Sequence, residues 1–370
     1  MDRHDDMSQL LGQLFMVGIP SPCLDTKDEN TRQILQDLRP GGVILFRRNY
    51  TDVETLAALC HKLHALDHTN PPLIAIDHEG GRVHRLSAPF THFPPALQLT
   101  HKRSPNSLNL VDSVDLAYRV GQAMGRELQA VGIDLDFAPV LDVFTNPDNT
   151  VIGDRAFSTD PQQVAALGCA LARGLRDAGV IPCGKHFPGH GATLIDSHQD
   201  LPRDERDRAR FEQIDLVPFR QACAEQIEML MTAHVLYPAF DPDLPATLSP
   251  RIINNLLRQQ LGFTGVVVSD DLEMGAIVRH GSVEQAAVDS LVAGADLLLV
   301  CQSPELAVQA RNACLQALET GRLSQQRLAQ ATQRIAVLKK KRRRKQLAAR
   351  EVIGSAAHQR LVEEIQRAGV

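Results

Sequence analysis

Eight short apolar runs recur along the chain. The runs lie at 14–19, 41–46, 72–77, 134–140, 180–187, 228–234, 265–270 and 296–301. Their β-branched and apolar residues do not alternate with polar ones, which is typical of strands buried on both faces. The pattern predicts eight strands of a largely parallel sheet.

Helical patterns separate most of these runs. Apolar residues recur at helical spacing in residues 51–66, 115–132, 161–180 and 282–295. The first pattern has Thr51 as a candidate N-cap with Glu54 three residues later, and two of the patterns close near a glycine. Eight strands with intervening helices predict a (β/α)₈ barrel of the TIM type. A doubly wound open sheet is the alternative, because periodicity alone does not show whether the sheet closes.

The organisation of the chain favours one domain. No internal repeat or low-complexity linker divides the 370 residues, and α/β barrels of this length are common. We expect a single catalytic barrel over residues 1–370, with a C-terminal helical tail from about residue 324. We also expect the protein to be a monomer.

Composition and charge exclude several classes of protein. A net charge of −5 gives no general attraction to nucleic acid or anionic lipid, and the basic run at 339–345 is interpreted as a complement to the C-terminal dipole of a helix. No window approaches the ~18 apolar residues of a membrane span, and the N-terminus is acidic where a secretory signal is basic. The seven cysteines are scattered and odd in number, as expected for reduced thiols. These features predict a cytoplasmic protein without nucleic-acid or membrane partners.

Polar and ionisable residues follow the ends of several predicted strands. They are Asp77, the pair Lys185 and His186, His234 and Asp270. Barrel enzymes place their chemistry at the carboxyl ends of the strands, whereas a lone polar group at such a position is as often a strand-end hydrogen-bonding group. The repetition of such residues predicts one converging site.

The densest ionisable stretch is KHFPGHGATLIDSHQDLP at 185–202. From the residues alone it could be a metal site, a polar loop without a catalytic role, or an acid/base centre. A metal site would use His186, His190, Asp196 and His198. Pro188 and Gly189 make a helix between the first two histidines improbable, and no cysteines are grouped for zinc, so we expect neither a metal nor another cofactor.

The motifs at these strand ends resemble family 3 glycoside hydrolases, in the branch of β-N-acetylglucosaminidases (NagZ type). The resemblance is carried by KHFPGHG with the following DSH, and by DHEGGRVHRL (77–86), DFAPVLDV (136–143), GDRAFS (153–158), MTAHVLYP (231–238) and SDDLEMGA (269–276). It implies a (β/α)₈ barrel that removes terminal β-linked N-acetylglucosamine with retention of configuration, in bacteria during cytoplasmic recycling of muropeptides. Where the family commonly has Gln, this chain has His84.

The resemblance also implies roles for individual residues. Asp270 corresponds to the nucleophile, with Asp271 as the neighbour most easily mistaken for it. His198 corresponds to the acid/base residue and Asp196 to its partner. An imidazole exchanges protons near neutral pH without a raised carboxylic-acid pKa. Asp77, Arg155, Lys185 and His186 correspond to the residues that hold the sugar hydroxyls.

Several alternatives remain open at this point. Arg82 is expected to brace its loop, and His234 is interpreted as a satisfied core histidine rather than a sugar contact. The protein would be a phosphorylase if phosphate replaced water as the acceptor of the sugar. A histidine as the acid/base residue leaves this open, because it repels phosphate less than a carboxylate does. One further alternative is another β-glycosidase activity of family 3. The other is a carbohydrate-binding or regulatory protein that keeps the barrel without turnover.

Overall fold

The computed structural model describes residues 3–20, 29–100, 110–193, 201–279, 281–342 and 348–369. Its eight strands form one closed barrel in sequence order. The strands are β1 (Phe15–Gly18), β2 (Gly42–Leu45), β3 (Leu73–Ile76), β4 (Leu135–Asp136), β5 (Ile181–Phe187), β6 (Met229–Thr232), β7 (Val266–Asp271) and β8 (Leu297–Val300). The predicted barrel is therefore confirmed, and the open-sheet alternative is wrong because β1 pairs in parallel with both β2 and β8.

Helices alternate with the strands. They are α1 (Arg3–Gly12), α2 (Glu29–Leu38), α3 (Val53–His64), α4 (Leu110–Ala130), α5 (Pro161–Asp177), α6 (Arg208–Gln213), α7 (Leu216–Ala224), α8 (Gly275–Val278), α9 (Val283–Ala293), α10 (Pro304–Glu319), α11 (Gln325–Lys341) and α12 (Ala356–Gly369). Shorter or irregular helices are η2 (Arg47–Asn49), η3 (Ala96–Leu99), η4 (Gly153–Arg155), η5 (Ala246–Leu248), η6 (Arg251–Gln260) and η7 (Arg350–Val352).

Two local predictions need correction. The N-cap of α3 is Asp52 and not Thr51, because the Asp52 carboxylate accepts the backbone N–H of Thr55 at 2.8 Å. Strand β4 covers two residues of the run predicted at 134–140. Past Asp136 the pairing with β5 continues irregularly, through the carbonyl oxygens of Ala138 and Pro139 and an isolated bridge between Val140 and Lys185.

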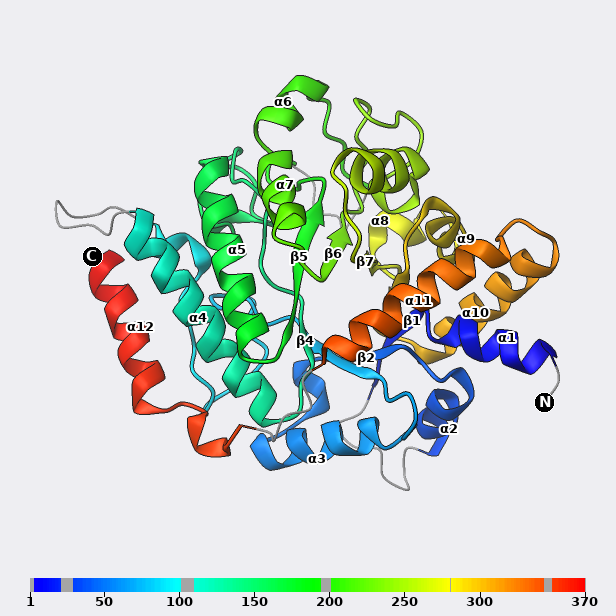
Figure 1. Cartoon of the computed structure of the whole chain (residues 1–370), viewed down its shortest axis with the longest axis horizontal. Coiled ribbons are helices and arrows are strands. Elements are labelled where there is room, and N and C mark those ends of the chain that lie inside the picture. The colour runs from blue at the N-terminus through cyan, green and yellow to red at the C-terminus, as the bar shows by residue number, and fades with distance from the viewer. Residues whose placement is uncertain are drawn as a thin grey trace. The chain divides into compact units, whose positions relative to one another are not determined.

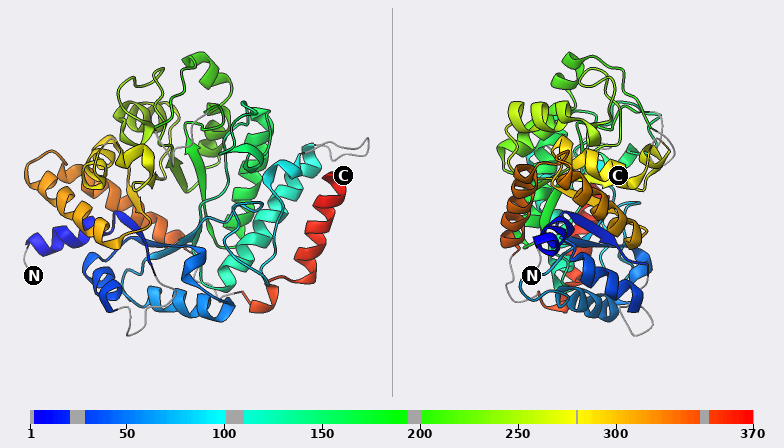
Figure 2. Two further views of the ribbon diagram at one scale, coloured as in Figure 1. Left: turned by 180° about the vertical axis from the view of Figure 1, so that it is seen from behind. Right: turned by 90° about the vertical axis from the view of Figure 1, so that its right-hand side faces the viewer.

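The chain divides into two compact units. The first comprises Met1–Ala75, Ile195–Glu205 and Met231–Lys341, and the second comprises Ile76–Leu194, Arg206–Leu230 and Arg342–Val370. In the second unit α4 lies beside both α5 and α12 (Figure 1, Figure 2). A Cβ at Gly174 would lie 2.2 Å from the carbonyl oxygen of Tyr118, so α4 and α5 approach closely only because this residue is glycine. Arg119 of α4 holds Glu364 of α12 through a bidentate pair at 2.7 and 2.8 Å.

In the first unit, three arginines converge on one buried carboxylate just before β8. Asp296 is fully buried and pairs with Arg258, Arg327 and Arg334. Its Oδ2 also accepts the backbone N–H of Val267 at 3.0 Å. This carboxylate therefore joins η6 and α11 to the two last strands of the barrel.

We expect Asp296→Ala to lower the free energy of unfolding by about 3–5 kcal/mol, because it leaves three guanidinium groups without their counter-charge. Urea denaturation measures the change. The control is Asp289→Ala, which breaks the more exposed pair with Arg322 and is expected to cost at most about 1 kcal/mol. Equal losses in the two variants would contradict a structural role for the arginine cluster.

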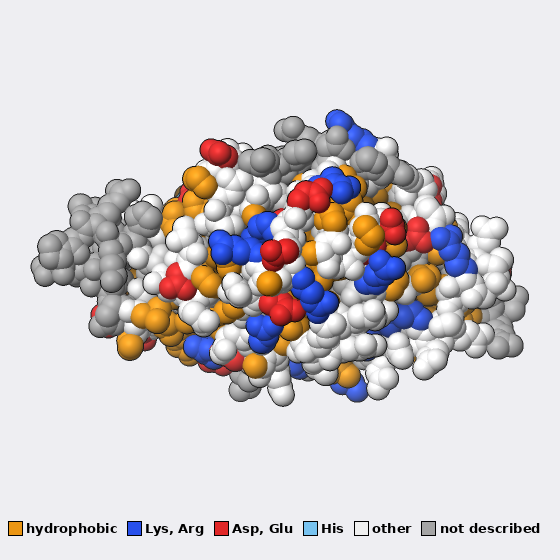
Figure 3. Space-filling view, turned by 90° about the horizontal axis from the view of Figure 1, so that it is seen from above, with side chains coloured by type: hydrophobic (Ala, Val, Ile, Leu, Met, Phe, Trp, Pro, Cys, Tyr) orange, Lys and Arg blue, Asp and Glu red, His pale blue; other side chains and the backbone are white. Residues whose placement is uncertain are grey.

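No described helix is long and apolar enough to cross a membrane. On the face shown in Figure 3, Lys and Arg side chains are interspersed with Asp and Glu side chains. Of the basic run at 339–345, Lys339 donates to Gln13 and Asn70, and residues 343–347 lie outside the described residues.

Candidate active site

The second unit brings together three of the four predicted sugar-binding residues in one chain of charges. At the carboxyl end of β3, Asp77 accepts a hydrogen bond from Lys185 Nζ at 2.6 Å. The same ammonium group lies 2.6 Å from Glu79 Oε1. Glu79 in turn accepts from Arg155 Nε and Nη2, both at 2.8 Å. The order of the charges is Asp77, Lys185, Glu79, Arg155, so every contact joins opposite signs.

The mutual contacts keep Glu79, Lys185 and Arg155 ionised. Burial by itself raises the pKa of Glu79, but the charges of Arg155 and Lys185 outweigh it and hold the pKa far below its ordinary value. Burial likewise lowers the pKa of Lys185, and the carboxylates of Asp77 and Glu79 reverse that effect and raise the pKa. The pKa of Arg155 is raised because Glu79 overcomes the effect of burial. The site is therefore a pre-ordered set of two cations and two anions.

A further carboxyl, that of Asp136, lies beside this network and has a raised pKa. Burial raises the pKa of Asp136 well above its ordinary value, and the charges of Asp77 and Glu79 add to this, although the backbone N–H of His78 and the charge of Lys185 oppose it. The Oδ1 atom accepts the N–H of His78 at 2.9 Å, whereas Oδ2 has no hydrogen-bond partner among the described residues.

The fourth predicted sugar-binding residue, His186, is oriented by a buried aspartate. Its Nδ1 lies 2.7 Å from Asp142 Oδ2. Asp142 Oδ1 also accepts the backbone N–H groups of His186 at 3.2 Å and His190 at 2.7 Å. Burial raises the pKa of Asp142, but His186 more than compensates and the net pKa is lowered. An ionised Asp142 accepts the Nδ1 proton, so Nε2 is the nitrogen left to face a ligand.

The loop after β5 depends on a close backbone approach. A Cβ at Gly191 would lie 1.8 Å from the carbonyl oxygen of Val143, so a larger residue would displace the loop. Arg82 braces the neighbouring segment, as predicted for its loop, by donating from Nη2 to the carbonyl oxygens of Thr150 and Val151. His84, at the position where the family commonly has Gln, lies between the rings of His78 and His92, with centroids 4.4 and 4.2 Å away.

The first unit carries the predicted nucleophile at the carboxyl end of β7. Asp270 Oδ1 accepts the backbone N–H of Asp271 at 2.8 Å. The next carboxylate is engaged differently, since Asp271 Oδ1 accepts the N–H groups of Glu273 and Cys301. His234 is fully buried, with Nδ1 2.8 Å from Thr247 Oγ1 and Nε2 2.9 Å from the carbonyl oxygen of Asp271. His234 therefore fixes the backbone beside Asp270, in agreement with its interpretation as a satisfied core residue.

Burial raises the pKa of Asp271 to about 7, and the charges of Glu273 and Asp270 add to the increase. The unfolded chain ionises first, so this carboxyl destabilises the fold progressively as pH rises from about 4 to 7. We expect Asp271→Asn to gain stability relative to the unmodified protein over that interval, by roughly 1–3 kcal/mol at neutral pH. Urea denaturation at pH 4.5 and pH 7.5 measures this, and a difference between the two proteins that does not change with pH would contradict it.

The predicted acid/base pair, Asp196 and His198, lies outside the described residues. Of the histidines proposed for a metal site, His190 Nδ1 lies 2.7 Å from Thr193 Oγ1, and His186 Nδ1 faces Asp142. Within the described part of the chain, no group of three or more His, Cys, Asp or Glu side chains is arranged to hold a metal ion.

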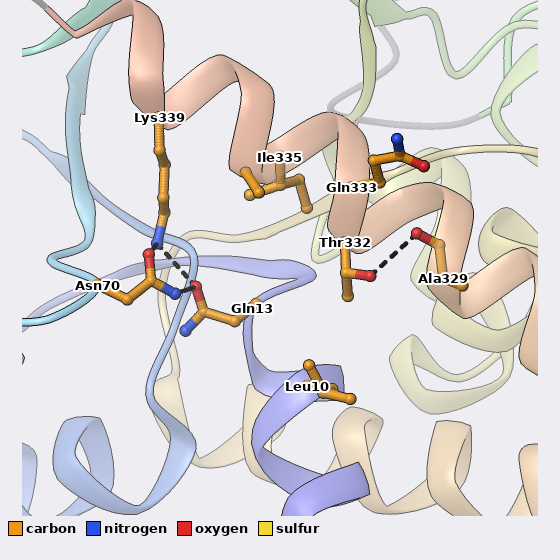
Figure 4. Close-up of a pocket in the computed structure, with 9 residues that line it drawn as sticks. Leu10, Gln13, Asn70, Ala329, Thr332, Gln333, Ile335 and Lys339 are labelled. Carbon is orange, nitrogen blue, oxygen red and sulfur yellow. Dashed lines mark hydrogen bonds between the residues drawn. The ribbon is translucent and has the colours of Figure 1, made fainter.

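A cavity of about 340 Å³ lies elsewhere in the first unit, between α1 and α11 (Figure 4). Leu10 and Ile335 line its apolar side, and Lys339 donates to Gln13 and Asn70 at its other side. The lining contains no carboxylate, histidine or cysteine. The lining of this cavity therefore offers no group suited to nucleophilic or acid/base catalysis.

Two residues of these arrangements, Glu79 and Asp142, were not among the predicted site residues. Each is a carboxylate within a quoted motif, DHEGGRVHRL or DFAPVLDV. Glu79 is 76 residues from Arg155 and 106 residues from Lys185 in sequence, and Asp142 is 44 residues from His186. Only the fold therefore reveals these contacts. A charged residue close to a buried strand end was the signal that could have found them.

Comparison with known proteins identifies the family. The model of the glycosyl hydrolase family 3 N-terminal domain matches residues 7–338. The chain belongs to glycosyl hydrolase family 3. It is 46% identical over 281 residues to a β-hexosaminidase of Thiobacillus denitrificans, covering 75% of this chain and 76% of the relative. A second β-hexosaminidase, of Alkalilimnicola ehrlichii, is 44% identical and covers 80% of this chain and 82% of the relative.

Solved structures of this family have the same fold. The family 3 β-N-acetylglucosaminidase of Paenibacillus sp. FPU-7 superposes with a TM-score of 0.90 at 38% identity, covering 98% of this chain and 68% of that one. NagZ of Neisseria gonorrhoeae was solved in complex with N-trifluoroacetyl-D-glucosamine. It superposes with a TM-score of 0.80 at 35% identity, covering 96% of this chain and 98% of that one. The predicted family and the predicted enzyme class, a glycoside hydrolase of the β-hexosaminidase type, are confirmed.

Proposed function

We propose that this family 3 protein is a retaining exo-β-N-acetylglucosaminidase that removes terminal β-linked N-acetylglucosamine. The observation that carries the proposal is the charge chain Asp77–Lys185–Glu79–Arg155 at the ends of the barrel strands. Charged groups held in fixed positions make strong hydrogen bonds to sugar hydroxyls. The similarity to a NagZ solved with an N-acetylglucosamine analogue supports this sugar as the ligand.

In the proposed mechanism Asp270 attacks the anomeric carbon and forms a glycosyl-enzyme. Its bonding supports this role over Asp271, since the pKa of Asp271 is raised to about 7 and two backbone N–H groups occupy one of its oxygens. His198, oriented by Asp196, protonates the leaving oxygen and then activates the incoming water. Asp77, Arg155, Lys185 and His186 hold the hydroxyls of the sugar, with Asp142 fixing the His186 ring.

The proposed setting is the cytoplasmic recycling of muropeptides, in which the substrate is N-acetylglucosamine linked to anhydro-N-acetylmuramic acid. The proposal retains one catalytic domain acting as a monomer on a small carbohydrate. The family resemblance supports the setting and the substrate.

The test is product analysis with aryl β-N-acetylglucosaminide and the matching aryl β-glucoside, each with and without phosphate. We expect hydrolysis of the N-acetylglucosaminide to a β-configured sugar at a rate independent of phosphate, and slow turnover of the glucoside. Formation of a sugar 1-phosphate would show a phosphorylase. Faster turnover of the glucoside would show another family 3 glycosidase, and binding without any turnover would show a carbohydrate-binding protein.

A further inference from the structure

The carboxylate of Glu79 lies between two cations that the proposed function assigns to sugar binding. Its Oε1 atom is 2.8 Å from Arg155 Nη2 and 2.6 Å from Lys185 Nζ, and its Oε2 atom is 2.8 Å from Arg155 Nε. All three donors belong to side chains that are at most 13% exposed. A single carboxylate therefore spaces an ammonium and a guanidinium group inside the protein.

Glu79 is placed to hold these cations and not to contact a ligand itself. Its side chain is 5% exposed, whereas that of Asp77, at one end of the same network, is 20% exposed. The described hydrogen bonds use three of the five N–H groups of Arg155, two on Glu79 and one on the carbonyl oxygen of Val151. The described contacts of Lys185 use two of the three N–H groups of its ammonium. Each cation therefore keeps donor capacity for a sugar oxygen.

Removal of the Glu79 charge would change the balance of the network. Lys185 and Arg155 would become neighbouring like charges with one carboxylate, Asp77, remaining beside the lysine. In a buried site, burial and the repulsion from Arg155 would then both lower the pKa of Lys185, which Glu79 now helps to raise. A neutral residue of the same shape thus alters both the placement and the protonation of a sugar-binding group.

We propose that Glu79 is a positioning residue for the sugar subsite: it sets the separation of Lys185 and Arg155 so that both donate to the bound sugar. The inference rests on the proposed function, because it takes both cations to be sugar-binding groups.

The test compares Glu79→Gln with a matched buried pair elsewhere in the same unit. Glu228 is also 5% exposed and accepts Arg176 in a bidentate pair at 2.8 and 2.9 Å, so Glu228→Gln removes an equivalent charge away from the strand-end network. The measurements are kcat and KM for an aryl β-N-acetylglucosaminide from pH 6 to 10, calorimetric affinity for N-acetylglucosamine, and urea stability. We expect Glu79→Gln to raise KM and weaken N-acetylglucosamine binding by about tenfold or more.

The pH profile separates positioning from stability. In Glu79→Gln a second alkaline loss of kcat/KM should appear below about pH 10, beyond the one set by the proposed acid His198, because Lys185 loses its proton earlier, whereas Glu228→Gln should lose stability and keep the original KM and profile. Glu79→Asp keeps the charge but is one methylene shorter, so KM should rise without this second alkaline loss. This second variant decides the matter if Glu79→Gln does not fold.

The inference would be overturned, and the proposed function left standing, if Glu79→Gln kept the KM and the alkaline pH profile of the unmodified protein. If Glu79→Gln does not fold, an unchanged KM in Glu79→Asp would overturn it in the same way. Failure of the unmodified protein both to hydrolyse the glycoside and to bind N-acetylglucosamine would overturn the proposed function, and the inference with it. The two failures are therefore distinguishable.

Discussion

Replacement of Asp270 by Asn is expected to reduce kcat/KM for aryl β-N-acetylglucosaminides by at least about 10⁴-fold. A neutral amide cannot form the glycosyl-ester that divides the reaction into two steps. The fold should survive, since the amide oxygen of asparagine can still accept the N–H of Asp271, now 2.8 Å from the carboxylate. Urea denaturation should therefore give nearly the same stability.

Trapping the intermediate tests the same assignment directly. A 5-fluoro N-acetylglucosaminyl fluoride keeps the acetamido group and slows both steps, so peptide mass spectrometry should find the sugar on Asp270. Azide should restore turnover of an activated aryl glycoside by Asp270→Asn, because a small anion can occupy the space of the missing carboxylate. Asp271→Asn is the control and should retain most activity. A label on Asp271, or equal losses in the two variants, would exclude Asp270 as the nucleophile.

The barrel could be predicted from the sequence because its signal is local. Each strand is a continuous apolar run, and helical spacing separates most of the runs, so the pattern states the order of the elements. It fails at local details of the backbone. The regular strand β4 ends at Asp136 although the apolar run continues to Val140, and Asp52 rather than Thr51 caps α3 because its carboxylate reaches the N–H of Thr55.

The candidate site was predicted less completely because its contacts are not local. Lys185 and Asp77 were identified at strand ends, and the structure places them 2.6 Å apart although 108 residues separate them. Glu79 could not be identified in the same way, because its charge alone does not show which residues it contacts. The raised pKa of Asp136 is likewise invisible in sequence, since burial and two neighbouring carboxylates produce it. Sequence reveals which ionisable groups exist, and packing decides which are charged.

The proposed acid/base residue, His198, predicts an effect that depends on the leaving group. His198→Ala removes proton donation to the departing oxygen. A nitrophenolate leaves readily without a proton, whereas a sugar alkoxide does not. We expect hydrolysis of a disaccharide to slow by about 10³-fold or more, and formation of the glycosyl-enzyme from a nitrophenyl glycoside to slow far less.

The second step extends this prediction. The same imidazole activates water, so the intermediate should accumulate in His198→Ala and give a burst of nitrophenol before slow turnover. Asp196→Ala should show the same pattern more weakly, because the ring remains but loses its orienting partner. Pre-steady-state rates for both variants on both substrates provide the measurement. If good and poor leaving groups suffered equal losses, His198 would be a binding residue, and the proton donor would have to be another group at the strand ends. His186 would then be the first to test, since Asp142 already holds its ring with Nε2 directed away from the pair.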